Sequence, residues 1–214
     1  MYHSYDARRR HASQKQISMT TDTHAARNRA LDLIKERSYR EGDFLLASGR
    51  KSRFYLDMKP TMFHPDGANL LGELILARIS NLNVDYVGGM AVGAIPLVTA
   101  VTVLSARTPH PLAGFFVRKE AKDHGTKRRV DAVDDLNGKN VVILEDVTTT
   151  GDSSMQAVEA ATHAGAHVLL VLSIVDRGEG AVEFYKSKGI AFDWLFRLSE
   201  FQATEDKRKG TRNG

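Results

Sequence analysis

Residues 141–153 read Val141-Val142-Ile143-Leu144-Glu145-Asp146-Val147-Thr148-Thr149-Thr150-Gly151-Asp152-Ser153. Four apolar residues lead into two adjacent carboxylates, and a run of hydroxyl side chains with one glycine follows. The next segment, from Met155 to Ala161, favours a helix. This order predicts a buried strand, a tight loop and a helix start. Backbone N–H groups at a helix N-terminus attract anions, so we expect the loop from Thr148 to Ser153 to hold a phosphate.

The two carboxylates, Glu145 and Asp146, are poorly suited to phosphate because like charges repel. They suit sugar hydroxyls, which donate to carboxylates, or a magnesium ion. An ordinary helix cap with surface acids would explain Asp152 or Ser153, but not two carboxylates at the end of a buried strand. A phosphate loop beside hydroxyl-binding acids therefore predicts a site for a phosphorylated ribose.

Length and composition set limits on the class of protein. The chain has 214 residues and 42% hydrophobic residues, which suits one α/β domain with a proper core. Cysteine is absent, so disulfides and thiolate metal sites are excluded, and a reducing compartment is consistent with this. The sequence has no apolar run of about 18 residues, as a membrane-spanning helix would need. The first 20 residues lack the apolar segment of a secretory signal. We therefore expect no membrane partner.

The net charge of +4 is located mainly in the two ends of the chain. Residues 1–20 carry +3 and residues 205–214 carry +2, which leaves −1 for the rest. We expect residues 1–22 and 204–214 to be disordered tails, and Met19 is an alternative start of the protein. Because the basic excess is not on the predicted domain, we do not expect a nucleic-acid partner.

Strand and helix patterns alternate through the predicted domain, residues 23–203. We expect helices over residues 23–38, 66–80 (capped by Asp66), 95–105 and 181–188, and one that includes residues 155–161 and ends at about residue 164. We expect strands over residues 44–46, 54–58, 86–89, 113–117, 141–145, 167–175 and 193–198, with a loop between Pro60 and Pro65. The later strands are continuous apolar runs, which predict a parallel sheet flanked by helices over about residues 66–198. The first two strands predict a small hood within about residues 23–62.

Unusual residues follow four of the predicted strands: Gly88-Gly89, Arg118-Lys119, Glu145-Asp146 and Asp176-Arg177. Ligands bind beyond the carboxyl ends of parallel strands, so we expect these groups to meet at one site. The run Gly88 to Gly93 fits neither a dinucleotide fingerprint nor a Walker A loop. It predicts either close helix packing or close backbone approach to a pyrophosphate.

Two further motifs have both a structural and a functional interpretation. The segment from Arg118 to Gly125 carries three cations and His124, on an expected loop that ends at Arg129. It is either a solvated charged loop or a lid that neutralises a pyrophosphate leaving group. Asp176 and Arg177 form either an ordinary ion pair or a place where Arg177 clamps a substrate carboxylate.

At these residues the chain resembles a known family. The stretch from Val141 to Ser153 resembles the phosphoribosyl-pyrophosphate signature of type I phosphoribosyltransferases. The segment from Arg118 to Gly125 resembles the catalytic loop of the orotate phosphoribosyltransferase family. Residues 48–55 are similar to the N-terminal hood of that family, which covers the base. The resemblance extends from about residue 30 to residue 198.

The resemblance implies transfer of ribose 5-phosphate from phosphoribosyl pyrophosphate (PRPP) to orotate, in cytoplasmic de novo UMP synthesis. It implies Mg²⁺ bound mainly through substrate oxygens, with no protein ligand assigned. It also implies a homodimer that shares the 118–129 loop across its interface. Lys119 would act within its own subunit, whereas the three residues that would act across the interface are Arg118, Lys122 and His124.

The remaining site residues follow from the same resemblance. Glu145 and Asp146 would bind the ribose hydroxyls, and Val147 with the loop Thr148 to Ser153 would complete the PRPP site. The residues that would contact orotate are Thr149, Arg177 and Tyr55.

The chain departs from the family pattern at three positions. Ala47 and Gly93 stand where some members have lysine, and Glu145 stands where aspartate is frequent. Fewer lysines leave more of the diphosphate charge to the 118–125 loop and the metal. Two alternatives remain open: a phosphoribosyltransferase for another base, and a regulator that senses PRPP.

Overall fold

The computed structural model describes residues 23–45, 49, 51–120 and 129–202. The expected tails, and Ala47, Lys122 and His124, lie outside these residues. The helices are α1 (Thr23–Arg37), α2 (Lys59–Met62), α3 (Pro65–Ile79), α4 (Ile95–Ser105), α5 (Asp152–His163), α6 (Ala181–Ser187) and α7 (Ser199–Gln202). The strands are β1 (Tyr39–Leu45), β2 (Lys51–Leu56), β3 (Tyr86–Gly88), β4 (Ala113–Val117), β5 (Val130–Ala132), β6 (Asn140–Thr148), β7 (His167–Asp176) and β8 (Phe192–Arg197).

The main sheet has six strands in the order β5-β4-β3-β6-β7-β8. All neighbours are parallel except β5, which pairs antiparallel with β4 at the edge. Because β3, β4, β6 and β7 are parallel neighbours, their carboxyl ends lie along one edge of the sheet. The predicted parallel α/β sheet is confirmed, and so is the convergence of the four strand ends.

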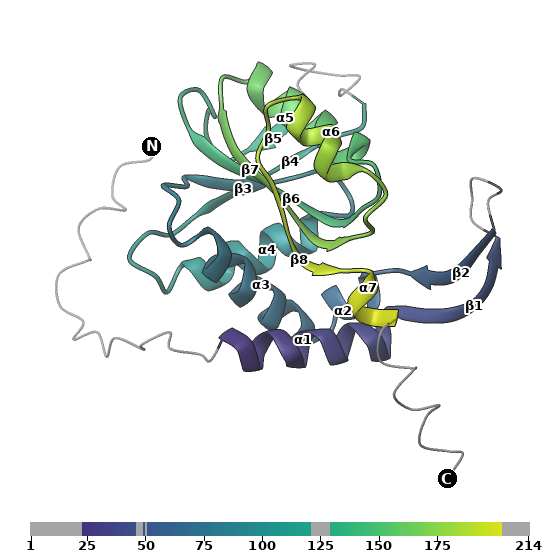
Figure 1. Cartoon of the computed structure of the whole chain (residues 1–214). Helices are drawn as coiled ribbons and strands as arrows, with labels where there is room; N and C mark the ends of the chain where they lie inside the picture. The colour runs from purple at the N-terminus through teal and green to yellow at the C-terminus, as the bar shows by residue number, and fades with distance from the viewer. Residues whose placement is uncertain (1–22, 46–48, 50, 121–128, 203–214) are drawn as a thin grey trace, which may run out of the picture.

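Helices cover both faces of the sheet, as Figure 1 shows, with α5 and α6 above it and α1, α3 and α4 below it. Side chains of β6 alternate between these layers. Val142 and Leu144 belong to the buried cluster with α1, α3 and α4, whereas Val141 and Ile143 belong to the cluster with α5 and α6. A strand covered on both faces is apolar at successive positions, which is why the sequence shows a continuous apolar run.

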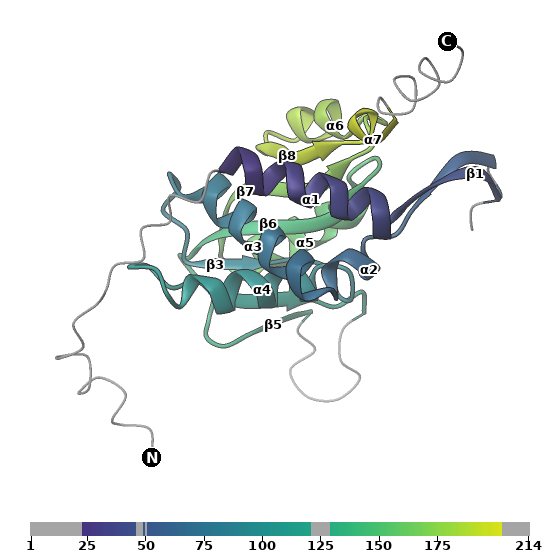
Figure 2. The same ribbon diagram turned by 90° about the horizontal axis from the view of Figure 1, so that it is seen from below.

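The β1–β2 hairpin projects from the body beside α2 (Figure 2). Its strands pair antiparallel from Tyr39 opposite Leu56 to Leu45 opposite Lys51. Both strands begin earlier than the sequence patterns predict, and the hairpin is the small antiparallel hood that was expected. Helix α1 does not belong to the hood, since Ala26, Ala30 and Ile34 pack into the main core.

Several local predictions were wrong. Residues 59–62 form the short helix α2, where a loop was expected between Pro60 and Pro65. Both prolines occupy the first turn of a helix, where the missing N–H costs no hydrogen bond. His64, not Asp66, is the N-cap of α3, and Asp66 lies in the first turn of that helix. The sequence patterns also missed β5 and α7, which have three and four residues.

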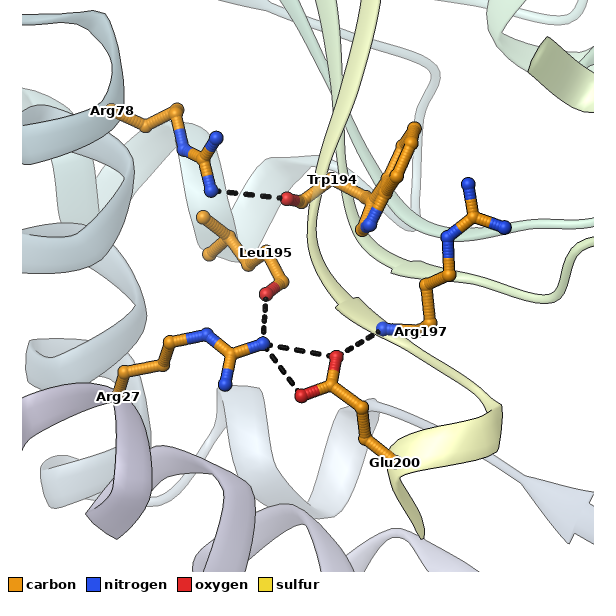
Figure 3. A network of polar contacts seen from close by, with 6 residues as sticks. All are labelled: Arg27, Arg78, Trp194, Leu195, Arg197 and Glu200. Atoms are coloured by element: carbon orange, nitrogen blue, oxygen red, sulfur yellow. Dashed lines mark hydrogen bonds and ion pairs between the residues drawn. The ribbon is translucent and has the colours of Figure 1, made fainter. Parts of the chain in front are cut away.

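A polar network joins the first helix to the last strand (Figure 3). Arg27 on α1 donates to both carboxylate oxygens of Glu200 and to the carbonyl of Leu195. The same carboxylate accepts the backbone N–H of Arg197 at 2.8 Å. Arg78 on α3 pairs with Asp193 and donates to the carbonyl of Trp194. Helices α1 and α3 are thus fixed to β8, the strand next to β7.

Candidate active site

The candidate site begins at the carboxyl end of β6. This strand continues to Thr148, three residues beyond its predicted end at Glu145. The reason is β7, which continues alongside and pairs Val175 with Val147 and Asp176 with Thr148. Glu145 and Asp146 are therefore strand residues, and their side chains point to opposite faces of the sheet. They contact different groups.

Glu145 points toward α5 and α6 and is mostly buried. Ser154 on α5 forms a hydrogen bond with its carboxyl group, while Oε2 is buried without a hydrogen-bond partner in the described part of the chain. Burial, and then the neighbouring charge of Asp146, raise the pKa of Glu145 to about 7. The buried oxygen is an acceptor that a substrate hydroxyl can satisfy.

Asp146 points to the opposite face, toward the turn that leads into α4. A Cβ atom built on Gly93 would lie 3.3 Å from Asp146 Oδ1. The same oxygen accepts the backbone N–H of Val147 at 2.9 Å. Burial raises the pKa of Asp146, although the Val147 N–H and the charge of Lys59 oppose this shift. The two carboxylates thus lie on opposite faces of the sheet at the end of β6.

The predicted phosphate loop is short: Thr149, Thr150 and Gly151 connect β6 to α5. Gly151 is the N-cap of α5 with φ of 101°, and no side chain caps the first turn. The hydroxyl of Thr150 donates to Asp152 at 2.7 Å, while Thr148 Oγ1 is buried without a hydrogen-bond partner in the residues described. The alternative of a helix cap by Asp152 or Ser153 is therefore wrong, and the first-turn amides are open to an anion.

A buried tyrosine, Tyr185 on α6, contacts this loop at Gly151. Its hydroxyl donates to the carbonyl of Gly151 at 2.9 Å and lies 2.8 Å from Ser154 Oγ. A Cβ at position 151 would lie 2.8 Å from the Tyr185 ring, so only glycine fits there. Burial raises the pKa of Tyr185 to about 12, which keeps the hydroxyl a donor at neutral pH. The sequence gives no signal for this role, because an aromatic residue on a helix reads as core.

The end of β7 places Arg177 beside the loop. Its backbone N–H donates to the carbonyl of Thr148 at 3.0 Å, which puts Arg177 next to Thr149. Its guanidinium pairs with Glu179 at 2.7 Å, while Nε is buried without a hydrogen-bond partner in the described residues. Asp176 does not pair with it, so the predicted Asp176–Arg177 ion pair is wrong. The unpartnered Nε–H is free for a substrate carboxylate.

The hood reaches Arg177 through Phe54. The guanidinium lies over the Phe54 ring, 5.0 Å from its centroid. Side chains of β2 alternate, so Tyr55 is on the other face, where its ring packs against Phe44 at 5.6 Å. The assignment of Tyr55 to orotate stays a prediction. Phe54 is the hood residue that lies at the site. From the sequence, only the alternation of side chains along the strand would have shown that Phe54 and Tyr55 lie on opposite faces.

The glycine-rich turn after β3 fits its packing interpretation, and its approach to a pyrophosphate stays a prediction. Gly88 and Gly89 are required for packing, since a Cβ would lie 2.3 Å from the Phe115 ring and 2.3 Å from the carbonyl of Leu144, respectively. Gly93 instead faces Asp146. Gly89 and Ala91 form backbone hydrogen bonds with Val117 at 2.8 Å, so this turn lies against the end of β4. The peptide bond between Ala91 and Val92 is cis.

Two of the four expected catalytic residues, Arg118 and Lys119, lie within the described part of the chain. Arg118 lies at the end of β4, where Nε donates to Asp131 at 2.6 Å and the guanidinium stacks on Phe116. Lys119 follows and is exposed. The backbone N–H of Arg118 donates to the carbonyl of Arg129, so the two ends of the 118–129 loop are adjacent at this edge.

A separate cavity of about 1200 Å³ lies between the β5 region and α5. Its lining includes Asp131, Asp134, Asp135 and Glu159, and the cations in it are fewer. An acidic lining disfavours a phosphorylated substrate, because like charges repel. The strand-end groups therefore remain the candidate site. Within the described residues, each helix is too short or too polar to cross a membrane.

The chain is similar to known proteins in sequence and in fold. No family model matches the chain. An orotate phosphoribosyltransferase of Rhodopseudomonas palustris is 48% identical over 180 residues, which covers 83% of this chain and 96% of the relative. The crystal structure of Mycobacterium tuberculosis orotate phosphoribosyltransferase in complex with Fe(III) dicitrate has a TM-score of 0.74 and 31% identity, and covers 82% of this chain and 98% of that one.

A second structure of the Mycobacterium tuberculosis protein contains a ligand. It is a complex with PRPP and has a TM-score of 0.71 at 27% identity, covering 83% of this chain and 99% of that chain.

Proposed function

The chain belongs to the orotate phosphoribosyltransferase family, and from this we propose that its strand-end site joins the ribose 5-phosphate of PRPP to orotate. The products are orotidine 5′-monophosphate and pyrophosphate, in de novo UMP synthesis. One observation carries the proposal. The N-terminus of α5, the carboxylates on β6 and Arg177, which directly follows β7, lie together at one sheet edge. These groups match the phosphate, the hydroxyls and the base carboxylate of the two substrates.

We assign the parts of PRPP by charge. The 5′-phosphate lies on the loop from Thr148 to Ser153, where open amides and hydroxyls donate to it. The ribose hydroxyls donate to Glu145 and Asp146. The diphosphate lies toward the Gly89–Gly93 turn and the end of β4, where Arg118 begins the cationic loop. This arrangement places the anomeric carbon between the strand end and the hood.

Orotate lies between the hood and β7. Its carboxylate accepts from Arg177, whose Nε–H has no hydrogen-bond partner among the described residues, and the Phe54 ring packs against the guanidinium. Thr149 follows the carbonyl that fixes Arg177, so its polar groups are near the base. A bidentate arginine distinguishes a carboxylate-bearing pyrimidine from uracil or adenine.

The chemistry requires positioning and charge more than covalent participation. The bond from the anomeric carbon to pyrophosphate breaks through an oxocarbenium-like state, and the base nitrogen attacks from the opposite side. Glu145 and Asp146 orient the ribose by its hydroxyls. Lys119, and the loop residues Lys122 and His124, neutralise the departing pyrophosphate. Closure of the loop over the site would exclude water from the sugar cation.

The donor set fits Mg²⁺ held through the substrate. Within the described ranges, no three His, Cys, Asp or Glu side chains come together as a metal site. We propose that ribose and diphosphate oxygens would be the main ligands of the ion. When bound, the ion would neutralise charge on the diphosphate.

The test is consumption of orotate by the purified protein with PRPP and Mg²⁺, with adenine and uracil as competing bases. We expect turnover of orotate, release of pyrophosphate and no loss of rate with either competitor. Turnover of adenine or uracil in preference to orotate would assign another base. Tight binding of PRPP without turnover of any base would favour a sensing regulator.

We also propose a homodimer in which the 118–129 loop of each subunit serves the neighbouring site, because the loop connects β4 to the edge strand β5. Mixed dimers test this. A Lys122→Ala subunit paired with a subunit carrying both Glu145→Gln and Asp146→Asn should recover activity, because one of the two sites is then intact. Heterodimers without activity would count against loop sharing. The pathway places the enzyme in the cytoplasm, which cell fractionation would check.

A further inference from the structure

Lys59 is a cation near the site that the sequence patterns did not single out. It is the first residue of α2, directly after the hood. Asp57 Oδ1 accepts both its backbone N–H at 3.0 Å and its side-chain Nζ at 2.9 Å. The Lys59 side chain is 62% exposed, whereas that of Asp57 is 27% exposed. The lysine is therefore held at its base and open to solvent at its charged end.

Lys59 lies on the same side of the sheet as Asp146. The side chains of Asp146 and Lys59 interact electrostatically, and Tyr55 on the hood interacts with Lys59 as well. Asp146 in turn faces the bare backbone of Gly93, with 3.3 Å from Oδ1 to the position of an added Cβ. Lys59 of α2 and Gly93, in the turn before α4, are thus both neighbours of the Asp146 carboxylate on β6.

The space beside Asp146, between Lys59 and Gly93, needs positive charge if a diphosphate is to occupy it. Asp57 and Asp146 repel an anion, and Gly93 adds no side chain. The arginines of the neighbouring strand ends already have acidic partners, since Arg118 pairs with Asp131 and Arg177 pairs with Glu179. An exposed ammonium group is a mobile point charge with three donors, which suits phosphate oxygens. Lys59 can keep Asp57 as a partner while it donates to an anion.

We propose that Lys59 binds the diphosphate of PRPP in the space between Asp146 and Gly93. The proposal rests on the proposed function and extends it. It assigns to α2 a role in substrate binding, and it supplies a cation at a place where the chain has glycine and some family members have lysine. Lys59 would contact the leaving group, whereas Asp57 orients the lysine.

The test compares Lys59→Gln with the conservative variant Lys59→Arg and with Asp57→Asn. Calorimetry in the presence of Mg²⁺ measures binding of inorganic pyrophosphate and, separately, of ribose 5-phosphate. Loss of one charged hydrogen bond corresponds to a change of about tenfold or more. We expect Lys59→Gln to weaken pyrophosphate binding by about that factor, and to raise the KM for PRPP similarly. Binding of ribose 5-phosphate and the KM for orotate should not change.

The controls distinguish substrate binding by Lys59 from a purely structural role of the Asp57–Lys59 pair. Lys59→Arg should keep most of the pyrophosphate affinity, and Asp57→Asn should keep it as well because the lysine charge remains. Pyrophosphate affinity in Lys59→Gln within twofold of the wild type would overturn the proposal. Equal losses in Asp57→Asn and Lys59→Gln would also overturn it, in favour of a structural pair. Absence of orotate turnover in the wild type would instead refute the proposed function, while the binding data would still decide the role of Lys59.

Discussion

At the scale of single residues, the feature with the clearest physical consequence is Glu145. It is a buried acid whose pKa is raised to about 7, first by burial and then by Asp146. In the unfolded chain the same group releases its proton near the ordinary value of 4.5. The folded state therefore gains from the bound proton below about pH 4.5, and loses this gain as the pH rises through about 7.

Glu145→Gln should remove this pH dependence, because glutamine does not titrate. We expect the free energy of unfolding of the wild type, relative to the variant, to fall between pH 5 and pH 8. The expected fall is about 2–3 kcal/mol, from about 1.4 kcal/mol per pKa unit. Urea unfolding at several pH values measures it, and Glu159→Gln on the exposed face of α5 is the control. Parallel curves for wild type and Glu145→Gln would show that the carboxyl group is not perturbed.

The sequence predicts residues of the site well where type and order carry the chemistry. Glu145, Asp146 and the hydroxyl loop could be read directly, since few structural roles require two acids after a buried strand. Tyr185 and Lys59 could not, because a tyrosine on a helix and a lysine after a strand are common for other reasons. Their roles follow from contacts with Gly151 and Asp57, which only the folded chain brings to light.

At the scale of elements, one arginine adds polar contacts to the apolar packing that attaches α1 to the sheet. Arg27 donates to Glu200 and to the carbonyl of Leu195, and its guanidinium lies 4.7 Å from the centroid of the Phe196 ring (Figure 3). About a third of each side chain of the Arg27–Glu200 pair is exposed, so solvent screens the ion pair. The hydrogen bond to a backbone carbonyl and the ring contact add to it.

Arg27→Ala should lower the free energy of unfolding by about 1–2 kcal/mol, since it removes all three interactions. Thermal or urea unfolding measures the change. Arg29→Ala, at an exposed position of the same helix, should have an effect within about 0.5 kcal/mol of zero. Equal stability of the two variants would mean that the network does not hold α1 in place.

Elements were predictable in proportion to their length and apolar content. The helix over residues 95–105 and the strand over residues 113–117 match the structure at both ends. The short elements were missed because they depend on neighbours: β5 exists through its pairing with β4, and β6 reaches Thr148 because β7 pairs with it there. Proline patterns were misread at α2, where Pro60 begins a helix and does not mark a loop.

At the scale of the whole molecule, the site is an assembly of distant segments. The sheet brings the ends of β3, β4, β6 and β7 to one edge, and the hood projects from the body beside α2 (Figure 2) and contacts Arg177 through Phe54. The first part could be predicted, because strands and helices alternate along the chain and the strands are continuous apolar runs. The pairing of Phe54 with Arg177 was not predictable, because no local pattern relates a hairpin to a strand end so far along the chain.

The central claim is that this assembly selects a base by its carboxylate, and Arg177→Gln tests it most directly. The matched control is Arg197→Gln, an arginine at the end of β8 that lies 3.7 Å from Asp176. Steady-state kinetics should show that Arg177→Gln raises the KM for orotate about tenfold or more, from loss of charged hydrogen bonds. The KM for PRPP should stay within about twofold, and the control should change neither value. An unchanged KM for orotate in Arg177→Gln, or an equal rise for both substrates, would contradict the account.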